Sequence, residues 1–213
     1  PVRGLAIGID WRLLRARADD AVLASIDHVV AVMTGLGARI VDVRLPEIDP
    51  VLEGWAVQCA VEAAIVHRDD WATRPEDFGP RLAALIDRGH RHTAFELAEA
   101  QERRRNFAGA MEAVYDACDV LLVPGLPVAG PTLDYMAGLG EDPAAILAIG
   151  PFTAPFDVAG QPTVTVPCGI SAAGIPIGCQ FAGPRFAEAL VARAGHAFQT
   201  ATDWHTRRPA SFA

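Results

Sequence analysis

The sequence has 213 residues, 51% of them hydrophobic, and a formal net charge of −8 at pH 7. A chain of this length can bury a substantial core as one domain, and its intermixed charges exclude the clustered basic face of a nucleic-acid-binding protein. No uninterrupted apolar run reaches the roughly 18–20 residues that a membrane-spanning helix needs. We therefore expect a single domain over residues 1–213 that lies in the cytoplasm.

All 18 basic residues are arginines, so a catalytic lysine cannot come from this sequence. The four cysteines lie far apart without a Cys-x-x-Cys pair, which favours free thiols in a reducing compartment, although a Cys168–Cys179 disulfide stays possible. His90 and His92 have no third ligand at useful spacing. We expect neither a metal site nor a cofactor.

The first 45 residues predict a βαβ unit. Residues 5–9 are a short apolar run typical of a strand covered on both faces. Apolar residues then recur at helical spacing over residues 20–36, and residues 38–45 predict a second strand. Connections this short favour parallel strands with a right-handed crossover.

The middle of the sequence predicts three helices, over residues 50–71, 75–88 and 93–117, followed by a buried strand over residues 119–123. From Pro124 to Pro162, proline and glycine recur among apolar residues. So long a segment inside a compact domain is usually functional, and we expect it to line a substrate pocket.

The last part of the sequence predicts a hairpin of strands over residues 163–170 and 175–181, and a closing helix over residues 186–200. Because a hairpin joins antiparallel strands, the sheet must be mixed. The sequence thus predicts an α/β fold with a mixed β-sheet.

The most informative motif runs from Thr153 to Gly169 and reads TAPFDVAGQPTVTVPCG. It is followed by GIPIGCQFAG, which begins at Gly174. These segments resemble the C-terminal signature of the amidase-signature family, in which T-x-P-(F/V)-N-x-A-G-x-P leads into a strand ending V-P-x-G. The next strand of that signature reads G-x-P-x-G-x-Q-x-x-G. Further segments over nearly the whole chain match in the same order.

The resemblance implies a mixed sheet with helices on both faces. It also implies hydrolysis of a linear carboxamide by a serine nucleophile, through an acyl-enzyme and a Ser–Ser–Lys triad. In the family that triad lies N-terminal to the segments found here. The only serines, Ser25, Ser171 and Ser211, are not in a Gly/Ser-rich loop, so we expect no catalytic residue in this chain and no activity of the chain alone.

The resemblance also indicates substrate-binding residues. Arg104 ends an A-Q-x-x-R motif whose arginine holds a substrate carboxylate in the glutamine-using members. Those members have an aspartate where this chain has Gly150, which disfavours glutamine as the substrate. Phe152, Thr153 and Asp157 complete the candidate set, and Asp157 replaces the usual asparagine of the motif.

We therefore interpret the chain as the C-terminal part of an amidase acting on a small apolar or aromatic amide. We expect its partner to be a missing N-terminal catalytic segment or a second copy of the chain. Three alternatives remain: the A subunit of a glutamyl-tRNA(Gln)/aspartyl-tRNA(Asn) amidotransferase, an allophanate-type hydrolase, and a non-catalytic binding module.

Overall fold

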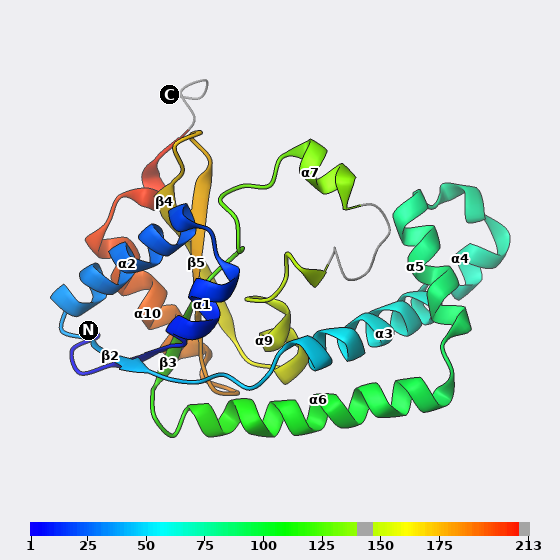
Figure 1. Cartoon of the computed structure of the whole chain (residues 1–213), viewed down its shortest axis with the longest axis horizontal. Helices are drawn as coiled ribbons and strands as arrows, with labels where there is room; N and C mark the ends of the chain where they lie inside the picture. The colour runs from blue at the N-terminus through cyan, green and yellow to red at the C-terminus, as the bar shows by residue number, and fades with distance from the viewer. Residues whose placement is uncertain (140–146, 209–213) are drawn as a thin grey trace.

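The computed structural model describes residues 1–139 and 147–208. It contains a five-stranded sheet in the order β2-β1-β3-β5-β4 (Figure 1). Strand β1 runs parallel to β2 and β3, whereas β5 runs antiparallel to β3 and β4. The mixed sheet predicted from the sequence is confirmed. Its strands are β1 (Ala6–Ile9), β2 (Arg39–Asp42), β3 (Val120–Pro124), β4 (Thr163–Ile170) and β5 (Pro176–Ala182).

Helices account for most of the remaining described residues, together with two short 3₁₀ turns at Pro75–Asp77 and Trp204–Thr206. The helices are α1 (Trp11–Arg17), α2 (Asp20–Gly35), α3 (Asp49–Val66), α4 (Arg68–Thr73), α5 (Pro80–Arg91), α6 (Ala94–Val114), α7 (Leu133–Gly138), α9 (Ala154–Ala159) and α10 (Glu188–Ala201).

The predicted βαβ unit consists of β1, α2 and β2. Helix α2 begins where the Asp19 carboxylate accepts a 2.8 Å hydrogen bond from the backbone N–H of Val22, a contact that satisfies one of the free donors of the first turn. Beyond its end, Gly37 adopts a φ of +89°, which glycine reaches without steric cost. The short helix α1 was not predicted.

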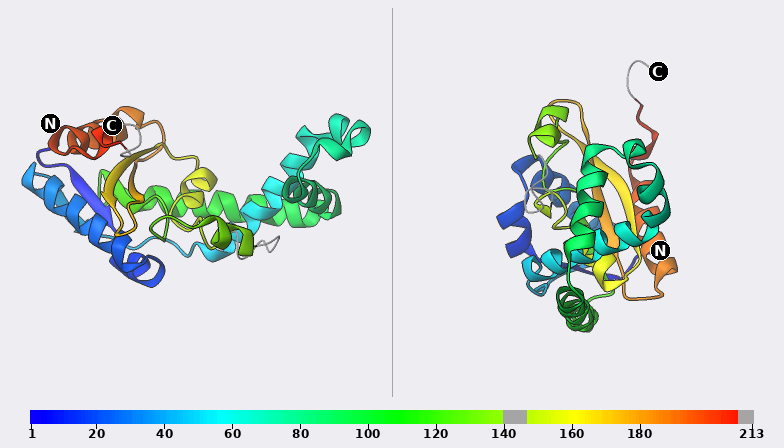
Figure 2. Two further views of the ribbon diagram at one scale, coloured as in Figure 1. Left: turned by 90° about the horizontal axis from the view of Figure 1, so that it is seen from above. Right: turned by 90° about the vertical axis from the view of Figure 1, so that its right-hand side faces the viewer.

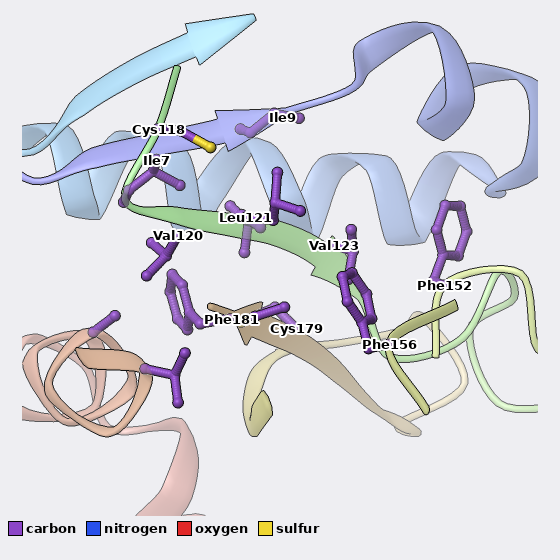
Figure 3. Close-up of a cluster of buried hydrophobic side chains, with 14 of the residues drawn as sticks. Ile7, Ile9, Cys118, Val120, Leu121, Val123, Phe152, Phe156, Cys179 and Phe181 are labelled. Carbon is purple, nitrogen blue, oxygen red and sulfur yellow. The ribbon is translucent and has the colours of Figure 1, made fainter. Parts of the chain in front are cut away.

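One face of the sheet is covered by α2 and α10, which contact each other and both β4 and β5. Because successive side chains of a strand point to opposite faces, Cys179 and Phe181 of β5 share one face and Gln180 lies on the other. Gln180 donates a 3.4 Å hydrogen bond to the carbonyl oxygen of Phe152, which precedes α9. Figure 3 shows part of the core around β1, β3 and β5.

The other face is therefore covered by the segment that contains α9. Within this segment, Phe152 and Phe156 are each 1% exposed and belong to the main hydrophobic core. Helices thus lie on both faces of the sheet, as the family resemblance implies.

Helices α3 to α6 form an arm that projects from the sheet (Figure 2). Small residues let its helices approach closely: a Cβ atom at Gly54 would lie 3.3 Å from Ala100 Cα, and one at Gly89 would collide with the carbonyl oxygen of Ala60. At the start of α6, Thr93 and Glu96 form a capping box. Such reciprocal hydrogen bonds fix the helix N-terminus.

Two predicted helices in this arm are interrupted. The helix expected over residues 50–71 is divided into α3 and α4 at His67. The helix expected over residues 75–88 starts only at Pro80, because Gly79 is extended, with a ψ of 153°. Proline is favoured in the first turn of a helix, and Pro80, not Pro75, begins the α-helix.

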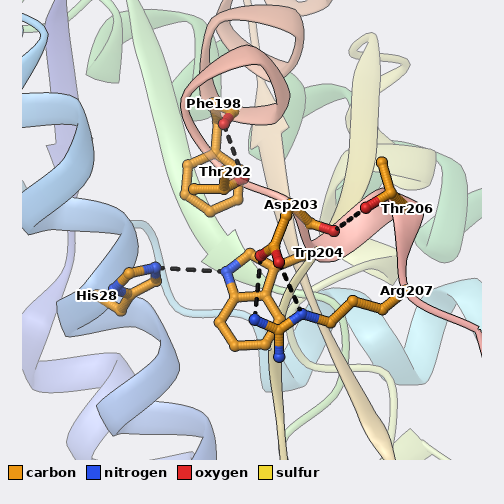
Figure 4. A network of polar contacts seen from close by, with 7 residues as sticks. All are labelled: His28, Phe198, Thr202, Asp203, Trp204, Thr206 and Arg207. Carbon is orange, nitrogen blue, oxygen red and sulfur yellow. Dashed lines mark hydrogen bonds and ion pairs between the residues drawn. The ribbon is translucent and has the colours of Figure 1, made fainter.

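The C-terminal turn is held against α2 (Figure 4). Trp204 Nε1 donates a 3.4 Å hydrogen bond to His28 Nε2 of α2. The Arg207 guanidinium lies 3.9 Å from the centre of the Trp204 ring and forms a 3.0 Å ion pair with Asp203. These contacts order the segment after α10.

Candidate substrate-binding site

Arg104 connects two helices that are distant in the sequence. Its Nε donates a 3.0 Å hydrogen bond to the carbonyl oxygen of Val158, so α6 is tied to the end of α9. Helix α9 is built by the T-x-P motif itself: Pro155 lies in its first turn, and Gly160 ends it in the left-handed conformation with a φ of 69°. The motif residues therefore place a short helix beside Arg104.

A polar cavity of about 170 Å³ lies between α3, α6 and α9. Its lining contains one guanidinium and two carboxylates, so the charged groups together carry a net negative charge. Burial raises the pKa of Asp157. Burial also raises the pKa of the Cys59 thiol, and the charges of Glu62 and Asp157 add to the effect. The lining residues are Trp55, Gln58, Cys59, Glu62, Arg104, Asp157 and Val158.

A larger, mainly apolar cavity of about 430 Å³ adjoins it. Trp55 and Cys59 line both cavities. The other walls come from α5, from the end of the α7 segment and from residues 147–149. The lining residues are Trp55, Ala56, Cys59, Arg81, Leu82, Leu85, Arg88, Met136, Leu139, Leu147 and Ile149.

A third cavity, of about 360 Å³, lies at the β4–β5 hairpin, where Thr153 and Thr165 line it. The hydroxyl of Thr165 donates a 3.1 Å hydrogen bond to Gln180 Oε1 on the neighbouring strand. Since Gln180 also donates to the Phe152 carbonyl, these hydrogen bonds connect the hairpin to the segment just before α9.

The structure brings only part of the predicted site together. Arg104 and Asp157 line the polar cavity, whereas Thr153 lines the cavity at the hairpin. The Phe152 side chain is packed in the core. The Gly150 carbonyl accepts hydrogen bonds from Thr153 and Ala154. Gly150 therefore shapes the turn into α9.

The contribution of α3 to these cavities was not predicted from the sequence. Trp55, Cys59 and Glu62 are spaced four and three residues apart, and such residues lie on one face of a helix. A tryptophan, a thiol and a carboxylate on one face could have been recognised as a candidate site wall. Leu82 and Leu85 of α5 were not predicted either, because they have the pattern of ordinary core positions.

Within residues 1–139 and 147–208, no group of three or more His, Cys, Asp or Glu side chains is arranged to hold a metal ion. A search of the same residues finds no helix with the length and apolarity needed to cross a membrane.

Several solved structures share this fold. One, titled "An unexpected vestigial protein complex reveals the evolutionary origins of an s-triazine catabolic enzyme. Inhibitor bound complex.", has a TM-score of 0.80 and 26% identity, and the match covers 97% of this chain and 45% of that one. A 6-aminohexanoate cyclic dimer hydrolase complexed with substrate has a TM-score of 0.81 at 22% identity, covering 100% of this chain and 48% of that one. At 22% identity, the second match shows the fold alone.

Curated sequences give a more specific relationship. A protein from Mycobacterium tuberculosis (strain ATCC 25618 / H37Rv), named "Putative amidase AmiD", is 40% identical over 203 residues, which is 95% of this chain and 42% of that protein. The A subunit of the glutamyl-tRNA(Gln) amidotransferase of Ralstonia nicotianae is 32% identical over 236 residues, 99% of this chain and 47% of that protein. The chain spans less than half the length of these relatives. The sequence model of the family described as Amidase matches residues 1–192, and the chain belongs to this family.

Proposed function

We propose that this chain forms the C-terminal, substrate-binding part of an amidase that hydrolyses a linear carboxamide through a serine acyl-enzyme. The Ser–Ser–Lys triad would come from a segment outside residues 1–213. The observation that carries this proposal is the family match over residues 1–192, in a sequence that contains no lysine. The 40% identity to the mycobacterial relative supports an amidase.

The described serines are poorly suited to act as nucleophiles. The hydroxyl of Ser25 donates a 2.9 Å hydrogen bond to the Ala21 carbonyl oxygen within α2. Ser171 lies in the β4–β5 turn, where its hydroxyl oxygen accepts a hydrogen bond from the Ile175 N–H. A serine nucleophile needs an adjacent general base, and neither of these contacts provides one. Ser211 lies outside the described residues.

Of the five candidate residues, three would face the substrate or the catalytic segment, and two would act indirectly. Arg104 and Asp157 would contact the polar part of the substrate, since both line the small cavity. Thr153 would face the incoming catalytic segment at the hairpin cavity. Gly150 and Phe152 would act indirectly. Gly150 would hold the turn into α9, and Phe152 would pack this segment against the core.

The remainder of the amidase domain would cover the hairpin side of the sheet. Strand β4 is at the edge of the sheet, and an unpaired strand edge favours association. Large apolar side chains are exposed close to this edge at Ile170 and Ile175, and at Leu126, which lines the hairpin cavity. We expect an interface on the order of 2,000 Å² or more with a catalytic segment or, as the alternative, with a second copy. A cytoplasmic location also belongs to the proposal.

An amidotransferase A subunit is the second candidate, favoured by 32% identity to the Ralstonia protein. The absence of a carboxylate at Gly150 opposes it. The two candidates differ in substrate: the amidotransferase would use glutamine as ammonia donor, whereas the amidase would prefer a simple carboxamide.

The experiment joins the chain to the upstream segment of its own gene and compares hydrolysis of a simple carboxamide and of glutamine. We expect hydrolysis of the carboxamide, lost when the serine nucleophile of the upstream segment becomes alanine. Exclusive use of glutamine would favour the amidotransferase. A joined, folded protein without amide hydrolysis would contradict the proposed function.

A further inference from the structure

We propose that the 430 Å³ cavity between α3, α5 and α7 is a specificity pocket for a hydrocarbon or aromatic group of the substrate. This inference rests on the proposed function, because it names the class of amide that the same site would bind. An uncharged amide with an alkyl or aryl substituent would place that substituent here.

The walls of the pocket are mainly apolar. Trp55 of α3, Leu82 and Leu85 of α5, Met136 of α7 and Ile149 after it surround the cavity. Pockets for small molecules typically enclose about 300–1,000 Å³ and are lined mainly by apolar side chains with a few polar groups. The pocket matches that description in both size and chemistry.

The cavity opens to solvent, since its lining residues are half-buried or exposed, so a ligand can reach it. Its apolar walls offer water few of the about two to four polar partners that an ordered water molecule needs. An apolar group of a ligand would fill the space and gain contacts that water cannot make.

The arginines of the wall do not convert it into an anion site. Arg81 Nη2 donates a 2.5 Å hydrogen bond to the carbonyl oxygen of Met136, which ties α5 to α7. Arg88 also interacts with other residues. The Arg81 guanidinium therefore holds two walls together, and the remaining lining is dominated by hydrocarbon and aromatic surface.

The apolar pocket joins the polar cavity. Trp55 and Cys59 line both spaces. One ligand could therefore place its hydrocarbon in the larger cavity while polar atoms reach Arg104 and Asp157. The carboxylates of Glu62 and Asp157 would repel an anionic substituent at this junction, which favours a neutral amide.

Cys59 provides a direct test of binding that does not require catalysis. The other three cysteines are buried, and Cys59 is half-buried. The rate at which iodoacetamide alkylates Cys59 in the 213-residue chain, measured by peptide mass spectrometry, reports occupancy of the pocket. The probes are acetamide, butyramide, hexanamide and phenylacetamide.

We expect protection of Cys59 with dissociation constants that fall about fourfold for each added methylene, the effect of burying one CH₂ group. Ala56→Leu fills the pocket and should remove this dependence on chain length. Ala31→Leu makes the same change at an exposed position of α2 and should leave it intact.

Leu85→Ala serves as a second variant if Ala56→Leu does not fold. It removes wall contacts, so protection by hexanamide should weaken about tenfold or more, while acetamide should change little. Equal protection by acetamide and hexanamide in the parent chain would overturn the inference. So would unchanged length dependence in a folded Ala56→Leu variant or in Leu85→Ala.

The experiments can disprove the pocket assignment and the proposed function separately. Length-dependent protection without amide hydrolysis by the joined protein would leave the pocket standing and contradict the function. Hydrolysis whose KM is the same for acetamide and hexanamide, together with no length-dependent protection, would contradict the pocket alone.

Discussion

Arg104 Nε donates a 3.0 Å hydrogen bond to the carbonyl oxygen of Val158, 54 residues further along the chain. The bond joins the long helix α6 to the helix that the T-x-P motif forms. It also holds Arg104 at the wall of the polar cavity. Because a guanidinium has five N–H donors, Arg104 can keep this bond and still donate to a substrate.

Arg104→Met should lower the free energy of unfolding by about 1–2 kcal/mol, since a half-buried hydrogen bond from a charged donor is lost. Arg105→Met is the matched control, because Arg105 is the next residue of α6 and is exposed. It should change stability by less than about 0.5 kcal/mol. Urea denaturation measures both. Equal effects would mean that the Val158 contact contributes nothing.

Two glycine substitutions should have opposite effects on the helical arm. Gly89→Ala places a Cβ against the carbonyl oxygen of Ala60, so we expect α5 to move away from α3 and stability to fall by several kcal/mol. Gly109→Ala meets nothing within 4 Å and should stabilise α6 by about 0.5–1 kcal/mol, the difference in helix propensity. The midpoint temperature of thermal unfolding measures both effects. Similar shifts of this temperature in the two variants would contradict the observed packing.

The Cys118 thiol should make the fold less stable at alkaline pH. Burial raises its pKa from the ordinary value of 9.0 to about 11. The folded state therefore keeps a proton that the unfolded state loses, so the contribution of Cys118 to stability is constant below pH 9 and is lost as pH rises from 9 to 11. The loss is at most about 2–3 kcal/mol.

Cys118→Ala should reduce this loss, even though it lowers stability at all pH values by leaving a small cavity. Burial also raises the pKa of Tyr115, and the hydrogen bond with Cys168 together with burial raises the pKa of Cys179, so some alkaline destabilisation should remain. Denaturant titrations at pH 7, 9 and 10.5 provide the test. A pH dependence equal to that of the parent chain would contradict the assignment.

Gly150→Asp tests whether this position separates simple amidases from glutamine-using relatives. The nearest atoms to a Cβ at residue 150 are Ala154 Cβ and the Leu147 carbonyl oxygen, both at 3.7 Å, so the variant should fold with little loss of stability. In the joined protein, we expect kcat/KM for glutamine relative to a simple carboxamide to rise about tenfold, the scale of one charged hydrogen bond. An unchanged ratio would mean that residue 150 does not contact the glutamine substrate.

Much of the sheet could be predicted because its strands are signalled locally. The bounds of β4 agree with the predicted residues 163–170, since proline, glycine and a short turn delimit the hairpin. The parallel unit around α2 was also recognisable, because a strand, an amphipathic helix and a second strand follow each other with short connections. Long, periodic elements carry enough information in their own residues.

Short helices and cavities could not be predicted in this way. Helix α9 has six residues, too few to show a helical period, and its Pro155 and the Gly160 that follows it are typical of a loop. The walls of the apolar cavity come from α3, α5, α7 and the segment after it, so no local pattern identifies them. Arg104 and Asp157 were predicted from the family resemblance, but the Val158 contact that positions Arg104 depends on tertiary structure.

We propose that this chain binds substrate and receives its catalytic serine and lysine from outside residues 1–213. The most direct measurement is the rate of aryl-amide hydrolysis by the purified chain, alone and joined to the upstream segment of its gene. We predict no turnover above buffer for the chain alone, and turnover by the joined protein that is lost when the upstream serine nucleophile is replaced by alanine. Turnover by the chain alone that disappears in a Ser25→Ala or Ser171→Ala variant would contradict the claim.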